Sequence, residues 1–131
     1  MRYIFLLILF SNFSEIGFSQ TAKADSILVI IENEKNDSVR QSKRLVYIQE
    51  VRHNFEFSKP IIEAGIAQAK QSHDFYYLGH FYYMGGIMYA YAGENELALD
   101  HFKTSLNYRV FEKDTAGIAG SYLGISNIYK V

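Results

Sequence analysis

Residues 75–111 read FYYLGHFYYMGGIMYAYAGENELALDHFKTSLNYRVF, and this stretch decides the fold. Its first half, Phe75–Tyr91, is almost wholly apolar and aromatic, as in a helix buried on most sides. Gly93-Glu94-Asn95 interrupts that run, and Gly93 suits the left-handed position that follows the end of a helix. Apolar residues at helical spacing then resume and continue to about Phe111. The stretch predicts two helices joined by a tight turn.

Helical periodicity extends over most of the remaining chain. It predicts further helices over about 25–33, 38–52 and 58–71, and one that begins near 116 and continues to the end. Pro60 is placed in the first turn of the 58–71 helix, where proline is tolerated. No segment alternates with a period of two for long enough to compete as a strand. Short polar loops favour antiparallel neighbours, so the predicted fold class is all-α.

A 40-residue offset relates two parts of the chain. It superposes Tyr82 on Tyr122, Tyr89 on Tyr129, and the loop residue Asp74 on Asp114. A fixed period of this length is typical of helical repeat proteins, in which each pair of helices buries its apolar face against the next pair.

These positions also carry a family resemblance. The spacing Tyr82-x-x-Gly85-Gly86-x-x-Tyr89 is similar to the first-helix pattern of the tetratricopeptide repeat family, and Ala98-x-x-x-Phe102 resembles its second-helix pattern. Small residues such as Gly86 and Ala98 allow two helices to approach closely, whereas the aromatic rings fill the space beside the crossing. The repeat-packing signature comprises Tyr82, Gly85, Gly86, Tyr89, Gly93, Ala98, Phe102, Tyr122 and Tyr129.

The chain departs from the family pattern at several positions. Tyr82 replaces the usual tryptophan, Gly85 replaces leucine, Val110 stands where a closing proline is expected, and Ser126 replaces a glycine. The offset of 40 residues also exceeds the usual repeat of about 34.

The resemblance implies an antiparallel helix-turn-helix solenoid of about two and a half units. Residues 39–72 form a degenerate unit, 75–111 the best unit and 115–131 a half unit. The apolar face of that half unit has no second helix to cover it, and a solenoid needs a polar terminal cap. We therefore expect the chain to be a piece of a longer protein. The uncovered residues are Ile118, Tyr122, Leu123, Ile125 and Ile128.

Residues 1–19 have the features of a secretory signal peptide. Arg2 precedes the apolar run Tyr3–Phe10, and the small residues Gly17 and Ser19 fit a cleavage site before Gln20. The run is too short to span a bilayer, which takes at least about 17 apolar residues. A buried N-terminal helix and a retained membrane anchor are the alternatives. We expect an exported, periplasmic or extracytoplasmic protein in which a short helix and loop, 20–38, precede the repeats.

Composition narrows the classes of function. The 131 residues include 13 Lys and Arg against 14 Asp and Glu, which argues against a nucleic-acid-binding segment. The absence of cysteine excludes disulfides, thiolate metal sites and cysteine nucleophiles. His53, His73, His80 and His101 do not form a ligand motif, and neither a phosphate-binding loop nor a nucleophile elbow occurs. We expect neither an enzyme nor a bound metal or cofactor.

In the tetratricopeptide family, first helices line a concave groove that binds a protein or peptide segment. Carried over, the groove residues are His80, Tyr83, Ile87, Ala90 and Tyr91 in the best unit, and Gly120, Leu123, Asn127 and Lys130 in the half unit. Only Asn127 and Lys130 resemble the residues that grip a terminal carboxylate in some members. The resemblance therefore implies an apolar, aromatic groove. Alternatively, Tyr83 and Tyr91 pack on neighbouring helices.

The order of signal, short helix and repeats resembles the extracytoplasmic N-terminal region of membrane-anchored regulators of Bacteroidetes-type bacteria. In those proteins the repeats precede a membrane helix and a histidine kinase or a LuxR-type output domain. The resemblance implies a sensory input region, tethered to a membrane through a C-terminal segment that this chain lacks. The alternative is a free periplasmic or secreted scaffold that assembles other proteins.

Overall fold

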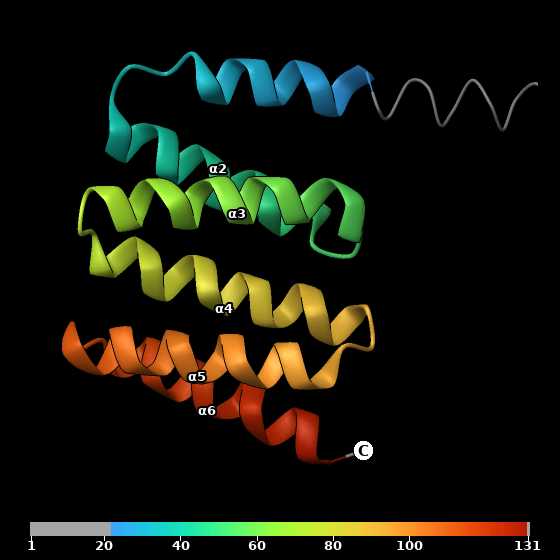
Figure 1. Ribbon diagram of the computed structural model, residues 1–131, viewed down its shortest axis with the longest axis vertical. Coiled ribbons are helices and arrows are strands. Elements are labelled where there is room, and N and C mark those ends of the chain that lie inside the picture. The colour runs from blue at the N-terminus through green and yellow to red at the C-terminus, as the bar shows by residue number, and fades with distance from the viewer. Residues whose placement is uncertain (1–21, 131) are drawn as a thin grey trace, which may run out of the picture. The chain divides into compact units, whose positions relative to one another are not determined.

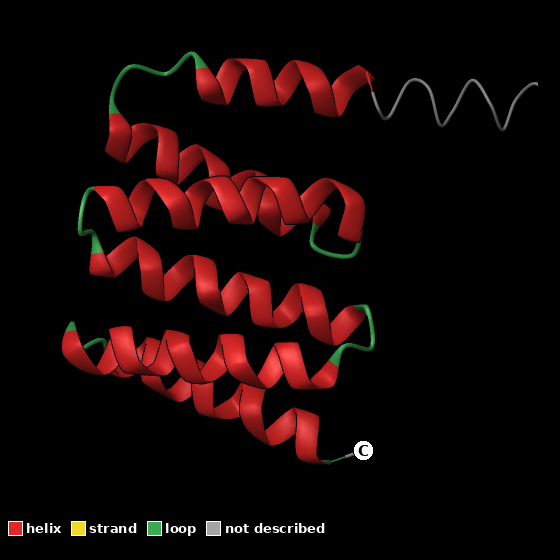
Figure 2. Cartoon of the chain, in the orientation of Figure 1, coloured by secondary structure: helices red, strands yellow, loops and turns green. Residues whose placement is uncertain are grey.

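The computed structural model describes residues 22–130. Within that range every regular element is an α-helix, and none is a strand (Figure 2). The predicted all-α class is confirmed. The predicted signal peptide lies outside the described residues. None of the described helices is long and apolar enough to cross a membrane.

The chain divides into two compact units between Asn36 and Asp37. In the first unit the described part consists of a helix over residues 22–32 and the turn that follows it. The described part of this helix already includes residues 22–24, which precede the predicted start at Asp25. The second unit contains the groove residues.

The second unit consists of five helices in antiparallel succession (Figure 1). Helices α3 to α6 begin 20 residues apart and are separated by three-residue turns. Each helix packs on the next, and α4 also contacts both α2 and α6. The helices are α2 (Asp37–Val51), α3 (Phe55–Gln71), α4 (Phe75–Tyr91), α5 (Asn95–Phe111) and α6 (Thr115–Tyr129).

The three turns after α3, α4 and α5 share one geometry. Their second residues, His73, Gly93 and Lys113, have positive φ angles of 53°, 78° and 56°. In each turn the third residue donates its N–H to the carbonyl five residues earlier, as from Asp74 to Ala69 at 2.9 Å. This is the Schellman arrangement, which satisfies carbonyls left free at a helix end. The left-handed position predicted for Gly93 is confirmed.

Side-chain caps fix where most of these helices begin. Asn54, Asp74 and Asp114 each accept a hydrogen bond from the backbone N–H three residues on, whereas Glu94 makes no such bond. Because Asn54 caps α3, this helix begins at Phe55, and Pro60 lies in its second turn. The predicted start at Ser58 was wrong. The last helix ends at Tyr129, with Lys130 as its C-cap, rather than running on to the end.

Aromatic rings seated on glycines bring neighbouring helices close together. The Phe81 ring of α4 lies against Gly65 of α3. The Phe102 ring of α5 lies between Gly86 of α4 and Gly124 of α6, and a Cβ on either glycine would come within 2.6 Å of the ring. Such spacing is shorter than van der Waals contact, so a side chain at these glycines would displace the ring.

The contact between Gly65 and Phe81 has a counterpart 40 residues later. There Ser105 of α5 and Ser121 of α6 are fully buried, and their hydroxyl oxygens lie 3.2 Å apart. The Ser105 hydroxyl also donates to the carbonyl of Gly79 at 2.7 Å. One interface position is thus occupied by a glycine and a large ring at α3/α4 and by two small polar residues at α5/α6.

Polar side chains join α2 to the other helices. The Tyr77 hydroxyl of α4 donates to the carbonyl of Ser38 at 2.9 Å. Gln41 donates to the carbonyl of Gly65 at 2.9 Å, and buried Arg44 donates to the side-chain carbonyls of Gln41 and Gln68. Buried polar groups cost little when they are hydrogen-bonded in this way.

Candidate protein-binding groove

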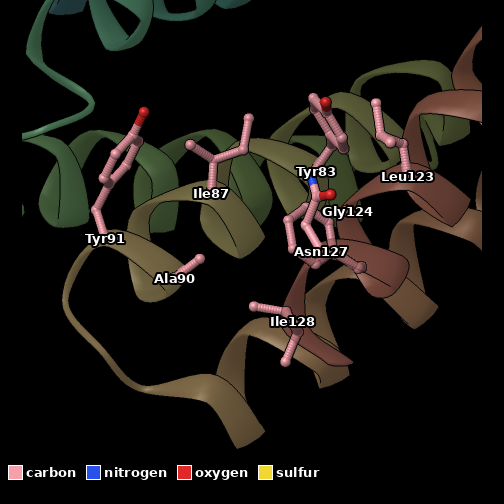
Figure 3. A pocket seen from close by; sticks show the side chains of 9 residues that line it. Tyr83, Ile87, Ala90, Tyr91, Leu123, Gly124, Asn127 and Ile128 are labelled. Carbon is pink, nitrogen blue, oxygen red and sulfur yellow. The ribbon is translucent and has the colours of Figure 1, made fainter. Parts of the chain in front are cut away.

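A groove lies between α4 and α6, and its pocket has a volume of about 290 Å³ (Figure 3). In Figure 3 Tyr91 and Tyr83 stand at opposite ends of the row of α4 side chains. Except for Asn127 and the two tyrosine hydroxyls, the lining side chains are apolar. The pocket is lined by Tyr83, Ile87, Ala90, Tyr91, Phe102, Leu123, Gly124, Asn127 and Ile128.

Helical spacing places these residues on two facing walls. On α4, Tyr83, Ile87 and Tyr91 follow one another every four residues and therefore share a face. On α6, Leu123 and Asn127 have the same spacing. Aromatic and aliphatic walls with a few polar groups are typical of sites that take an apolar side chain of a ligand.

Phe102 contributes to the pocket from α5. Its ring reaches the space between α4 and α6 because Gly86 and Gly124 leave room for it. The ring centroid of Tyr83 lies 5.6 Å from that of Phe102, a spacing at which aromatic rings attract each other. The pocket is therefore built on a packed part of the helical core.

The structure brings together most of the groove residues predicted from the sequence. Tyr83, Ile87, Ala90, Tyr91, Leu123 and Asn127 all line the pocket, whereas His80 and Lys130 do not. Gly120 lies next to the pocket, where a Cβ on it would be 3.8 Å from the Tyr83 ring. Gly124 and Ile128 also line the pocket and were not predicted, although they lie four residues after Gly120 and Gly124 and so share their face. Phe102 was assigned to packing alone.

Tyr83 and Tyr91 differ in how firmly they are held. Tyr83 is half-buried and packs against Phe102 and Arg109. Tyr91 is 59% exposed, and the centroid of its ring lies 4.4 Å from that of the His53 ring. Tyr83 thus packs on neighbouring residues, as the alternative interpretation expects. More than half of Tyr91, by contrast, is open to solvent.

The residues of the packing signature fall into two groups. Those of α4 and α5 are in contact: the rings of Tyr82 and Tyr89 lie 5.4 Å and 4.8 Å from His101, Gly85 faces that same imidazole, and Ala98 is fully buried. Tyr122 and Tyr129, their counterparts on α6, are exposed on the outer face of that helix. The structure therefore does not bring these two residues into a helix crossing.

Arg109 of α5 is a buried cation in contact with the pocket residue Tyr83, and it is only 5% exposed. Its Nη1 donates to the Gly117 carbonyl at 2.7 Å and lies 3.4 Å from the Ser121 hydroxyl oxygen. Its guanidinium carbon lies 4.5 Å from the centroid of the Tyr83 ring, as in a cation–π contact. The sequence pattern gives no signal for this contact, because Arg109 resembles an ordinary basic residue near a helix end.

Burial lowers the pKa of the Arg109 guanidinium, and the nearby charge of Asp114 acts in the opposite direction. Arginine nevertheless remains protonated at neutral pH. Burial and the positive charge of Arg109 also lower the pKa of His80, whose ring packs against Tyr76 at 4.5 Å. The neutral form of the His80 imidazole is therefore favoured.

The groove walls carry very little charge of their own. Neither α4 (Phe75–Tyr91) nor α6 (Thr115–Tyr129) contains an acidic residue, a lysine or an arginine. Among residues 22–130, histidines and carboxylates do not come together in a group of three that could hold a metal ion. The arrangement is suited to binding an apolar segment.

The chain matches no family model, no curated protein and no solved structure. The assignment of a function therefore rests on the geometry of the groove and on the sequence pattern.

Proposed function

We propose that this chain is a non-catalytic protein-interaction module of tetratricopeptide-like architecture. The groove between α4 and α6 binds an extended segment of a partner protein. The observation that carries the proposal is the pocket itself, where Tyr91, Ile87 and Leu123 present apolar surface that the rest of the described chain leaves uncovered. Exposed apolar patches of this kind commonly mark binding sites.

The regular spacing of the helices supports the architecture in this proposal. Helices α3 to α6 begin 20 residues apart, so a pair of helices occupies 40 residues. Contacts at Gly65–Phe81 and Ser105–Ser121 occur at the same offset. In helical repeat proteins, neighbouring first helices form one continuous surface, and the contacts of α4 with α2 and α6 fit that arrangement.

The place of the module in the cell is part of the same proposal. An N-terminal segment with the pattern of an export signal precedes the helices, so the groove faces the periplasm or another extracytoplasmic space. We assign the module to the input side of a membrane-anchored regulator, in which occupancy of the groove is passed on through a further segment. This role rests on the order of the sequence segments.

A peptide-display experiment tests the proposal. A phage library of random 12-residue peptides is selected on the full chain, and the recovered peptides are synthesised with a fluorophore. Their affinities are then measured by fluorescence anisotropy for the wild type and for Tyr91→Ala. Because large aromatic residues often dominate binding energy, we expect Tyr91→Ala to weaken binding at least about tenfold.

Tyr122→Ala is the matched control, because Tyr122 has nearly the same exposure, 58% against 59%, but lies outside the pocket. This variant should bind the peptides as the wild type does. Equal loss in both variants, or no selectable peptide at all, would rule out the groove as the binding site.

A further inference from the structure

The outer face of α6, formed by Ile118, Tyr122, Ile125 and Tyr129, is an apolar surface separate from the groove. These residues follow one another at spacings of three and four and therefore share one side of the helix. Tyr122 and Tyr129 are 58% and 69% exposed, and the two isoleucines are partly buried. Within residues 22–130, α6 packs on α5 and α4, and no helix covers this face. Exposed apolar surfaces of this kind commonly mark interfaces.

The same face of α4 is covered in this structure, but by a helix that α6 does not fit. Forty residues earlier, Tyr82, Gly85 and Tyr89 form the corresponding face of α4, and His101 of α5 packs on all three. A Cβ on Gly85 would lie 2.6 Å from the His101 ring, and α6 has Ile125 at this position. A helix with the side chains of α5 therefore cannot pack equally closely on α6.

We propose that the outer face of α6 binds the same face of a second copy of the chain, with the two α6 helices antiparallel. The pairs Ile118–Tyr129 and Tyr122–Ile125 are centred on one point of the helix. A two-fold axis through this point places each tyrosine ring against an isoleucine of the second copy. The face is thus complementary to itself in this direction, because every large ring meets a smaller aliphatic side chain.

The charges at the two ends of α6 favour the antiparallel direction. The helix Thr115–Tyr129 contains no charged residue, its N-cap is Asp114, and its C-cap is the exposed Lys130. Two-fold pairing brings Lys130 of each copy within about one helical turn, roughly 5 Å along the axis, of the second copy's Asp114. Glu112 and Lys113 beside Asp114 cancel each other, so Lys130 meets a net negative charge. A parallel arrangement would instead bring like charges and like ends of the helix dipoles together.

The contact is small, so we expect a weak dimer. The 15 residues of α6 extend about 22 Å, and one face of such a helix buries less than the roughly 800 Å² per partner of a stable complex. A dissociation constant of about 100 μM is in keeping with this size. The groove remains open in the dimer, because Asn127 lies about half a turn around α6 from the outer face. The inference therefore does not depend on the proposed function.

Analytical ultracentrifugation of the full chain over about 10 μM to 1 mM tests the dimer. Tyr122→Arg and Tyr129→Arg each put a charge into the apolar contact, so each should raise the dissociation constant at least about tenfold. Val46→Arg, at a residue that is 61% exposed on α2, is the matched control and should dimerise as the wild type does. Circular dichroism checks that the variants fold. A wild type that stays monomeric throughout, or two arginine variants that dimerise normally, would overturn the proposal.

Cysteine cross-linking tests the direction of the two helices, because the chain has no cysteine of its own. Ile118→Cys and Tyr129→Cys are mixed in equal amounts and oxidised, and intact mass spectrometry separates the mixed disulfide dimer from the two symmetric dimers. The mixed dimer should exceed its statistical share. Identical residues of the two copies lie about 16 Å apart along the axis, beyond the roughly 7 Å between Cα atoms that a disulfide bridges. A statistical mixture, or an excess of symmetric dimers, would contradict the antiparallel pairing.

Discussion

The hydroxyl oxygens of Ser105 and Ser121 lie 3.2 Å apart at the α5/α6 interface, at the position that Gly65 and Phe81 occupy between α3 and α4. Each pair fills a similar space, one with two small side chains and the other with a ring against a bare backbone. The size of one residue in a pair therefore limits the size of the other. This dependence can be measured as an interaction energy between the two positions.

A double-mutant cycle tests this dependence. We expect Ser121→Phe alone to destabilise the chain by about 1–3 kcal/mol, because the new ring meets the Ser105 side chain in a filled core. Adding Ser105→Gly should recover part of that loss, with an interaction energy of about 1 kcal/mol or more. Urea unfolding of the wild type, the two single variants and the double variant gives the four free energies. Simple additivity would contradict the compensation.

Replacing each of two glycines on α6 by alanine should change the free energy of unfolding in opposite directions. A Cβ on Gly124 would come within 2.6 Å of the Phe102 ring, which Gly86 confines on its other side. Gly124→Ala should therefore lower the free energy of unfolding by about 1–3 kcal/mol. At Gly120 the nearest atoms are at 3.5 Å, so Gly120→Ala should raise it by up to about 1 kcal/mol through helix propensity. Thermal unfolding of both variants checks the signs, and a common sign would contradict this packing.

The helix caps offer a comparison within one chain. Asp74 and Asp114 each accept a hydrogen bond from a backbone N–H at the start of a helix, whereas Glu94, at the same position before α5, accepts none. Asp74→Ala and Asp114→Ala should each cost about 1 kcal/mol of stability, and Glu94→Ala should be close to neutral. Chemical denaturation measures all three. A cost at Glu94 as large as at Asp74 would show that the cap bond is not the cause.

The three Schellman turns differ in the residue at their left-handed position. Gly93 adopts a positive φ freely, but Lys113 does so with a Cβ that crowds the backbone. Lys113→Gly should therefore stabilise the chain by up to about 1 kcal/mol, and Gly93→Ala should destabilise it by a similar amount. Differential scanning calorimetry provides the test. Destabilisation by Lys113→Gly would mean that the lysine side chain makes a contact worth more than the relief of strain.

Stability should fall as the pH drops below about 6.5, the ordinary pKa of histidine. The pKa of His80 is lowered in the folded chain, chiefly by burial and then by the charge of Arg109. The unfolded chain therefore takes up a proton first, so this contribution is complete above about 6.5 and decreases as the pH falls toward the lowered value.

Unfolding measured between pH 8 and 5 should show this decrease in the wild type, and His80→Gln should reduce it. His73→Asn, which removes an exposed imidazole from a turn position at positive φ, is the control variant. An unaltered slope in His80→Gln would assign the pH dependence to other groups.

Much of the fold could be predicted from local signals. Gly93 and the caps Asp74 and Asp114 mark turns by their own chemistry, so the bounds of α4 and α5 followed from the sequence. The predicted start of α3 was wrong because proline is favoured in the first turn of a helix, whereas Pro60 lies in the second turn. Asn54 is an equally good cap four residues before the predicted start at Ser58, and the structure uses it.

The groove could be predicted only in part, because the contribution of α5 to its lining depends on which helices pack together. The resemblance to tetratricopeptide repeats assigned Tyr83, Ile87 and Leu123 to the groove, and all three line the pocket. Phe102 reaches the groove from α5 between Gly86 of α4 and Gly124 of α6, and no spacing within α5 indicates this. Once Gly79 and Gly117 are known to face Arg109, its burial follows from the space they leave.

The alternation of ring-on-glycine and serine-on-serine contacts also bears on how the chain avoids misassembly. Chains with similar successive helices can trap themselves by docking a helix on the wrong neighbour. If α6 docked on α3, Ser121 would face Gly65 and leave a void where the Phe81 ring belongs. If α4 docked on α5 through the face that it presents to α3, the Phe81 ring would collide with Ser105, since even a Cβ on Gly65 would lie within 2.4 Å of this ring. The volumes of the contact residues on each helix thus match only those of its native neighbour, which disfavours docking on the wrong helix.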